Sequence, residues 1–169
     1  MNQQFFDEFI DITRALNRYE KKPLLIGSLG LEFVTKKDWN PSDIDIHLPG
    51  DPRGWEAHDE DRIYDFDIIQ SAMENLGYEL VDLHEHEFKK EDKSVEIGSM
   101  DSTGEFAGID LNELIEVQYD GAIFLVPTLE QFLKIYEASS KDSYRNDNNN
   151  NKDFGKIKYL KSLGYWGKE

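Results

Sequence analysis

Cysteine is absent from this chain of 169 residues, which excludes disulfide bonds and thiolate chemistry. Long apolar runs are missing too, because no stretch approaches the roughly 18 residues that suggest a membrane span. The first four residues carry neither the charged leader nor the apolar segment of a signal peptide. These absences predict a cytoplasmic protein that does not associate with a membrane.

Positive charge is scarce, since 19 Lys and Arg residues stand against 35 Asp and Glu residues, for a formal net charge of −16. A field of that sign opposes binding to nucleic acid or anionic lipid. No dense basic run offsets it, only scattered pairs such as Lys21-Lys22 and Lys89-Lys90. We therefore expect a nucleic-acid partner to be disfavoured and a small-molecule partner to be favoured.

The apolar residues suffice for one packed domain over residues 1–169, because 38% of the chain is hydrophobic and 12% is aromatic. Apolar positions at helical spacing predict helices over 2–19, 28–36 and 59–76, then from 129 and from 153. Alternating or continuous apolar runs predict strands over 24–27, 43–48, 78–88, 94–97, 114–118 and 122–126. This order favours an α/β (α+β) fold with a mixed sheet and flanking helices, with a core at about 20–126 and a helical part at 127–169.

The most informative segment is an apolar strand that ends in Gly27-Ser28 and is followed by Asp43-Ile44-Asp45-Ile46. A Gly-Ser turn at a helix start, with Ser28 as the expected N-cap, offers free backbone N–H groups to phosphates. Side chains alternate along a strand, so Asp43 and Asp45 are expected to share one face while the isoleucines face the core. Two such carboxylates can share divalent cations with nucleotide phosphates, which predicts a metal-dependent nucleotide site.

These motifs resemble the nucleotidyltransferase fold of the DNA polymerase beta superfamily, although the 14 residues between Ser28 and Asp43 make a slightly long gap for that family. The superfamily carries a third carboxylate on a later strand, for which Glu96 is the best match and Asp101 the alternative. The resemblance implies two Mg²⁺ ions held by Asp43, Asp45 and Glu96. It also implies that Gly27 and Ser28 contact the outer phosphates of a nucleoside triphosphate.

The C-terminal third resembles, more loosely, the tail of the bacterial abortive-infection toxin nucleotidyltransferases. The matching features are the strand, proline and helix of residues 125–134, then Arg145, then Lys152-Asp153-Phe154. This resemblance implies that Lys134, Arg145 or Lys152 faces the nucleotide or supports the loops around it. The Asn-rich run between Arg145 and Lys152 departs from the pattern of those toxins.

The activity these resemblances imply is transfer of a nucleoside monophosphate from a triphosphate to a hydroxyl of a small molecule, a protein or RNA. A catalytically inactive nucleotide-binding or regulatory protein of the same fold is the alternative, and a homodimer is compatible with either.

Two further features leave alternatives open. The expected strand 78–88 carries three alternating polar residues, Asp82, His84 and His86, which could bind zinc. Alternatively, His84 or His86 lines the acceptor side of the cleft. Arg53 and Trp55 follow the acidic strand, where they either contact the nucleotide or hold the loop to the surface.

Overall fold

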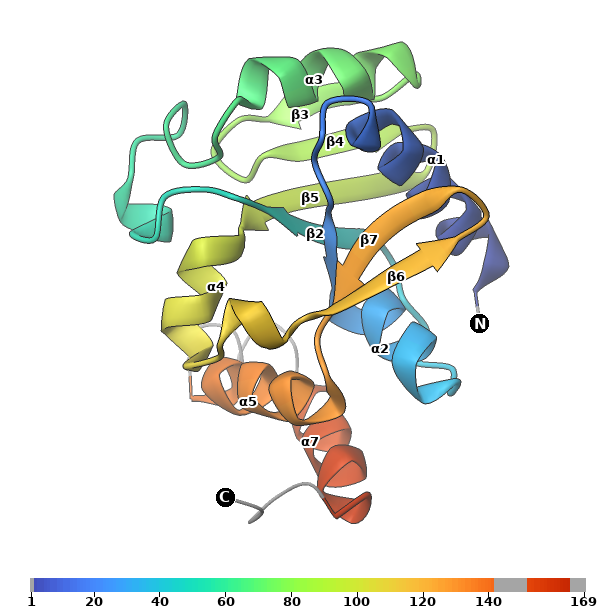
Figure 1. The fold of residues 1–169 in the computed structure, drawn as a ribbon, viewed down its shortest axis with the longest axis vertical. Helices are drawn as coiled ribbons and strands as arrows, with labels where there is room; N and C mark the ends of the chain where they lie inside the picture. The colour runs from blue at the N-terminus through green and yellow to red at the C-terminus, as the bar shows by residue number, and fades with distance from the viewer. Residues whose placement is uncertain (1, 142–151, 165–169) are drawn as a thin grey trace.

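The computed structural model describes residues 2–141 and 152–164, which form a mixed β-sheet flanked by helices (Figure 1). Within these residues the sheet has seven strands in the order β3-β4-β5-β2-β1-β7-β6. The β2–β5 and β1–β7 pairs are parallel, and the other neighbours are antiparallel. The strands are β1 (Leu24–Ile26), β2 (Ile44–Leu48), β3 (Glu79–Asp82), β4 (Glu87–Lys90), β5 (Lys93–Ser99), β6 (Ile115–Tyr119) and β7 (Ala122–Val126).

The helices divide into an upper and a lower group in the view of Figure 1. Helix α1 packs on β7 and on α3 above the middle of the molecule, whereas α5 packs against α4 and α7 below it (Figure 1). The helices are α1 (Gln3–Asn17), α2 (Gly27–Thr35), α3 (Phe66–Asn75), α4 (Met100–Ala107), α5 (Leu129–Ser140) and α7 (Lys152–Ser162), with short 3-10 turns η1 (Gly54–Glu56) and η2 (Leu111–Glu113).

The two faces of the sheet have different environments, as the alternation in β2 predicts. Ile44, Ile46 and Leu48 are fully buried in the main hydrophobic core, together with apolar residues of α1 and α3. Asp45 and His47 alternate with them and lie half-buried on the opposite face. Burial of one face therefore fixes the register of β2 and turns its polar side chains to the other face.

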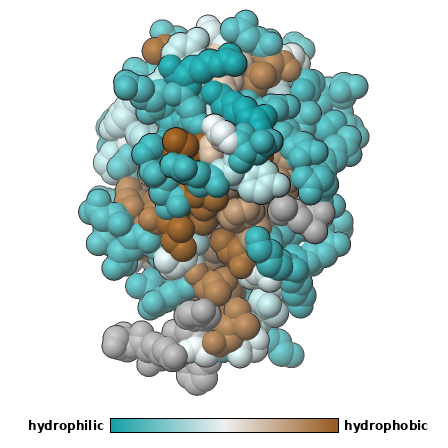
Figure 2. Space-filling model, turned by 45° about the vertical axis from the view of Figure 1, so that its right-hand side comes forward, coloured by the Kyte–Doolittle hydropathy of each residue, from teal (hydrophilic) through white to brown (hydrophobic). Residues whose placement is uncertain are grey.

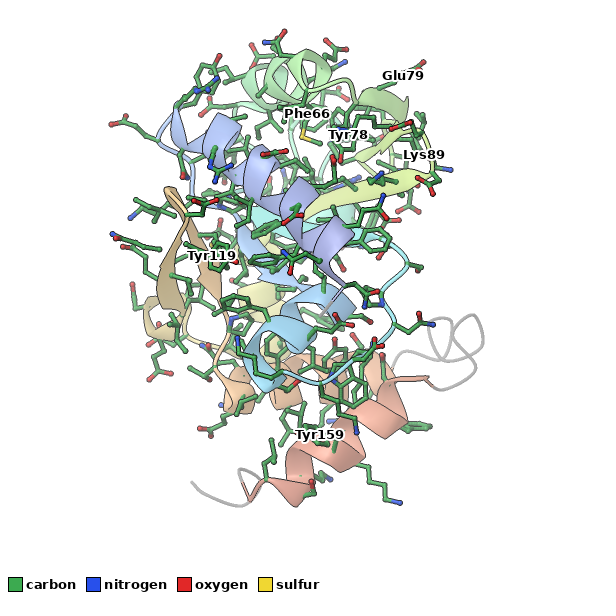
Figure 3. The ribbon with its side chains drawn as sticks, turned by 90° about the vertical axis from the view of Figure 1, so that its right-hand side faces the viewer. Phe66, Tyr78, Glu79, Lys89, Tyr119 and Tyr159 are labelled. Atoms are coloured by element: carbon green, nitrogen blue, oxygen red, sulfur yellow. The ribbon has the colours of Figure 1, made fainter. Side chains whose placement is uncertain are left out.

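Helix α1 contacts both halves of the sheet. At one end, Phe6 meets Tyr119 of β6 edge-on, with 5.0 Å between ring centroids. Tyr119 is labelled in Figure 3. Toward the other edge of the sheet, the Tyr78 hydroxyl donates to Glu8 at 2.7 Å, and Lys90 pairs with the same carboxylate at 2.8 Å. These contacts hold α1 across the face of the sheet that carries the main core.

Several predicted elements are confirmed. The 114–126 hairpin forms as β6 and β7 around Asp120 and Gly121, which both have positive φ, as a two-residue turn requires. Helix α5 begins with the expected capping box between Thr128 and Gln131. Helix α1 and the strand pair β1–β2 also lie where the sequence predicts them.

Other predictions were wrong in their boundaries. The helix expected from residue 59 begins at Phe66, because Asp65 adopts a left-handed conformation that ends the preceding turn. The strand expected over 78–88 is split into β3 and β4 by a turn at residues 83–86, and α4 was not predicted. Ser28 does not cap α2, since the helix begins one residue earlier and Ile26 is at its N-cap position.

A groove runs beside the edge strand β6. Figure 2 shows apolar side chains gathered in a band across the middle of this face. The groove has a volume of about 880 Å³ and contains none of the predicted site residues. Its apolar lining comes from Phe33, Val34, Ile115, Val117, Val126, Pro127 and Leu129.

Candidate functional site

The sheet face opposite the main core carries the two predicted carboxylates side by side. Asp45 of β2 and Glu96 of β5 are register partners in a parallel pair, so their side chains leave the same face of adjacent strands. Both line a cleft of about 680 Å³. Asp43 precedes β2 and is half-buried, and it is not among the residues that line this cleft. The structure thus brings two of the three predicted carboxylates together.

Gly27 lies directly beside Asp45, because Ile26 pairs with Asp45 in the antiparallel β1–β2 ladder. Gly27 has a φ of +68°, and a Cβ built on it would stand 3.0 Å from the Cβ of Asp45. Only glycine allows both this backbone conformation and this approach without strain. The start of α2 is therefore held next to a carboxylate, where backbone N–H groups and the helix dipole favour an anion such as a phosphate.

Lys156 of α7 adds a positive charge at the start of α2. Its Nζ donates a hydrogen bond to the Ser28 hydroxyl at 2.9 Å and lies 4.9 Å from the centre of the Tyr136 ring. Tyr136 lines the cleft, so Lys156 stands at its border. Lys156 was not predicted as a site residue, although it follows the suggested Lys152 by one helical turn.

His47 lies next to the carboxylates, on the same face of β2 as Asp45. Its Nδ1 is 2.6 Å from the hydroxyl oxygen of Thr103, and its Nε2 is 3.9 Å from Asp45 Oδ1. Gly98 of β5 leaves room for the ring, because a Cβ there would stand 2.6 Å from Nε2. Burial of the imidazole lowers the pKa of His47 to about 4, so His47 is neutral near pH 7.

Arg62 organises the wall of the cleft formed by the loop after β2. Its guanidinium is buried and pairs with Asp59 at 2.7 Å. The same group donates to the Gly54 carbonyl at 3.2 Å and lies 4.4 Å from the centre of the Trp55 ring. The single buried guanidinium of Arg62 therefore holds the loop that carries Trp55.

The possible zinc site of Asp82, His84 and His86 is not formed, because the expected strand is interrupted by the turn at 83–86. His86 is buried, with Nδ1 3.0 Å from Arg62 and Nε2 2.8 Å from the Asp59 carbonyl oxygen. Burial, with the charge of Arg62, lowers the pKa of His86. His84 lines the cleft, which agrees with the other expectation for this segment.

No group of three or more His, Asp and Glu side chains is arranged to hold a metal ion within residues 2–141 and 152–164. This finding applies to Asp43, Asp45 and Glu96 as they stand. Mg²⁺, however, is commonly bound by one or two carboxylates, with substrate phosphates and water completing its six ligands. Asp45 and Glu96, which are register partners and line the same cleft, fit that mode of binding, in which the nucleotide brings the remaining ligands.

The three cations predicted near the nucleotide come from the C-terminal part of the chain. Lys134 is exposed on α5, which turns Ile135 and Tyr136 to the cleft instead. Lys152 begins α7, and Arg145 lies outside the described residues. The structure therefore gives no support to Lys134 as a nucleotide contact.

Two further candidates form local contacts in the loop after β2. Asp101 accepts a hydrogen bond from the Gly50 backbone N–H at 3.0 Å, which gives it a role in holding that loop. Arg53 pairs with Asp51 at 2.7 Å and is not among the residues that line the cleft, whereas Trp55 belongs to that lining.

The fold is similar to that of a known nucleotidyltransferase. The structure matches the solution structure of the nucleotidyltransferase ANT(2'')-Ia, an antibiotic-resistance factor, with a TM-score of 0.58 and 14% sequence identity. The match covers 84% of this chain and 75% of that one. No protein-family profile matches the sequence.

The chain belongs to the family of the uncharacterized protein YnaI of Bacillus subtilis (strain 168). The two sequences are 38% identical over 163 residues, which cover 95% of this chain and 97% of YnaI. Among the described residues, no helix has the length and apolar character needed to cross a membrane.

Proposed function

We propose that this protein transfers a nucleoside monophosphate from a nucleoside triphosphate to a hydroxyl group and releases pyrophosphate. The observation that carries the proposal is the register pairing of Asp45 with Glu96 beside the Gly27 turn. A carboxylate pair next to an anion-binding helix start is what a triphosphate with its bound cations requires. The likeness of the fold to a nucleotidyltransferase supports the same conclusion.

Asp45 and Glu96, joined by Asp43, would hold two Mg²⁺ ions together with the phosphates. When bound, these ions would neutralise phosphate charge and lower the pKa of the attacking hydroxyl. The start of α2 and Lys156 would bind the outer phosphates, through backbone N–H groups and an ammonium charge. These groups would orient the triphosphate with its α-phosphate toward the carboxylates.

In the transfer itself, a bond forms between the acceptor oxygen and the α-phosphorus while the bond from that phosphorus to pyrophosphate breaks. Glu96 would accept the proton of the acceptor hydroxyl. Most of the acceleration would come from positioning and from neutralisation of charge that is already in place before the reaction.

Pyrophosphate release tests turnover directly. The wild-type protein is incubated with Mg²⁺, each of the four ribonucleoside triphosphates and a panel of small alcohols and nucleosides. We expect release of pyrophosphate together with transfer of an α-³²P label to one class of acceptor. Glu96→Gln should abolish this turnover and leave binding of the Mg²⁺–nucleotide in place.

A nucleotide-binding protein without turnover is the second candidate. It is favoured by the position of Asp43 outside the cleft lining and by the lack of a preformed three-carboxylate group in the described part of the chain. Binding of a nucleotide without pyrophosphate release by the wild type, with any acceptor, would support this candidate over the enzyme.

A further inference from the structure

The cleft extends from the carboxylates toward a second end. Gly27 lies beside Asp45 near the start of β2, whereas Trp55 belongs to the loop that leaves the other end of this strand at Leu48. Figure 1 shows this loop extending away from α5 and α7, which carry the groups near Ser28. If the triphosphate binds at Ser28 and Lys156, the end at Trp55 is left for the acceptor.

Three exposed rings line the cleft and are here called the aromatic wall: Trp55 and His84 at this end, and Phe106 of α4. Trp55 is 61% exposed and Phe106 is 56% exposed, and all three rings line the same cleft as Asp45 and Glu96. The rings of Trp55 and His84 are 5.1 Å apart between centroids. They come from three separate segments, so the fold itself assembles this surface.

The aromatic wall is held in place before any ligand arrives. The guanidinium of Arg62 covers Trp55 at 4.4 Å and also donates a hydrogen bond to the backbone carbonyl of His84. The His84 ring is fixed in turn by a 3.0 Å contact of Nδ1 with Asp59, which also pairs with Arg62. A surface ordered in advance loses little conformational entropy when a ligand binds.

The charges around the aromatic wall select against an anion. Asp45, Glu85 and Glu96 line the cleft, and Arg62 is the one Lys or Arg among its described lining residues. The guanidinium of Arg62 is already engaged by Asp59 and by backbone carbonyls. A planar ring can stack on Trp55 or Phe106, whereas a carboxylate or phosphate would enter a described lining in which acidic side chains outnumber the single guanidinium.

We propose that the aromatic wall is the acceptor subsite, and that the acceptor is a small molecule with a planar ring, a hydroxyl group and no negative charge. This inference rests on the proposed nucleotidyl transfer. Stacking on the aromatic wall would hold the ring, and the hydroxyl would reach toward Asp45 and Glu96, where the α-phosphate is expected. The hydroxyl would lose its proton on bonding to phosphorus, as described above.

The test is a titration of the ¹⁵N-labelled wild-type protein with tryptophol, a neutral indole that carries a hydroxyl. The chain has three tryptophans, and the indole N–H signal of Trp55 is identified by its loss in Trp55→Phe. We expect tryptophol to shift this signal saturably. The non-planar 2-cyclohexylethanol and the anionic indole-3-acetate should each bind about tenfold more weakly.

Matched variants locate the binding. Phe106→Ala should weaken tryptophol binding about tenfold, because stacking area is lost. Trp39→Phe, which changes a tryptophan outside the cleft lining, should leave binding unchanged. Equal binding of tryptophol and 2-cyclohexylethanol, no saturable shift at all, or no effect of Phe106→Ala would each overturn the proposal.

The titration is made without nucleotide or Mg²⁺, so its failure is distinguishable from failure of the proposed function. Phe106→Ala should retain the Mg²⁺-dependent binding of the triphosphate. Tryptophol binding in a protein that binds no triphosphate would contradict the transfer reaction, and with it the assignment of the aromatic wall to an acceptor. Triphosphate binding without tryptophol binding would overturn the aromatic wall alone.

Discussion

Single residues in this cleft have roles that follow from what lies within a few ångströms of them. Gly27 is one example, because its backbone conformation and its approach to Asp45 both exclude a side chain. Lys156 and His47 are defined in the same way, by a hydrogen bond to Ser28 and by burial beside Asp45.

Replacing Gly27 should damage both stability and the site. Gly27→Ala introduces a Cβ at a φ of +68° and 3.0 Å from Asp45, which should lower the free energy of unfolding by about 1–3 kcal/mol. Chemical denaturation measures this loss. Gly121→Ala is the matched control, because Gly121 also has positive φ but its Cβ would meet nothing within 4 Å. Nucleotide binding should be lost in Gly27→Ala and retained in Gly121→Ala.

Lys156→Gln should weaken triphosphate binding about tenfold, since it removes one charge-assisted contact at the start of α2. Isothermal titration with Mg²⁺ and the preferred triphosphate gives the dissociation constants. Lys158→Gln changes an exposed lysine of the same helix and should have no effect. Equal affinities of the two variants would remove Lys156 from the phosphate site.

His47 should make stability depend on pH. Burial lowers its pKa from the usual 6.5 to about 4, so the unfolded chain takes up a proton at a higher pH than the folded one. The free energy of unfolding should therefore fall as the pH drops from about 6.5 toward 4, by about 3 kcal/mol for this residue. His86, whose pKa is also lowered, adds to the same trend.

Denaturation at pH 7 and pH 4.5 measures this trend. His47→Gln should lose stability mainly at pH 7 and show a smaller difference between the two pH values than the wild type. The exposed His58→Gln serves as the control and should keep the wild-type difference. A His47→Gln protein with an unchanged difference would contradict the role of burial.

At the scale of elements, local patterns decided which parts could be predicted. The alternation in 43–48 and the capping box at Thr128 depend on neighbouring residues alone, and both are confirmed. The strand predicted over 78–88 was wrong because its alternation continues through a turn that Arg62 holds, and Arg62 hydrogen-bonds to His84 and His86 across 22 and 24 residues.

The candidate site shows the same limit. Asp45 and Glu96 could be predicted, because each is a lone acid between apolar residues on a strand. Lys156 could not be selected among several C-terminal lysines, since its contact with Ser28 spans 128 residues. The aromatic wall depends on three separate segments, of which only Trp55 and His84 had been considered beforehand.

The loop that carries Trp55 should depend on Arg62. Arg62→Met removes a buried cation that engages Asp59, Gly54 and two histidine positions, and should lower the free energy of unfolding by about 2–4 kcal/mol. Arg53→Met removes an exposed pair with Asp51 in the same loop and should cost less than about 1 kcal/mol. Equal losses in the two variants, measured by denaturation, would contradict the organising role of Arg62.

At the scale of the whole molecule, the net negative charge opposes binding of a triphosphate, whereas the groups around the cleft favour it. The net charge of −16 repels a triphosphate, so binding depends on local positive groups and on cations that accompany the nucleotide. The start of α2 and Lys156 provide the first, and the Asp45–Glu96 pair would recruit the second. A nucleotide should therefore bind tightly only together with Mg²⁺.

Thermal unfolding with each of the four ribonucleoside triphosphates, with and without Mg²⁺, tests this central claim most directly. A ligand at about a hundred times its dissociation constant adds about 2.7 kcal/mol, which raises the melting temperature by several degrees. The account predicts such a rise for at least one triphosphate with Mg²⁺, and its loss in Asp45→Asn. No rise with any triphosphate, or an equal rise in Asp45→Asn, would contradict a nucleotide site built on Asp45 and Glu96.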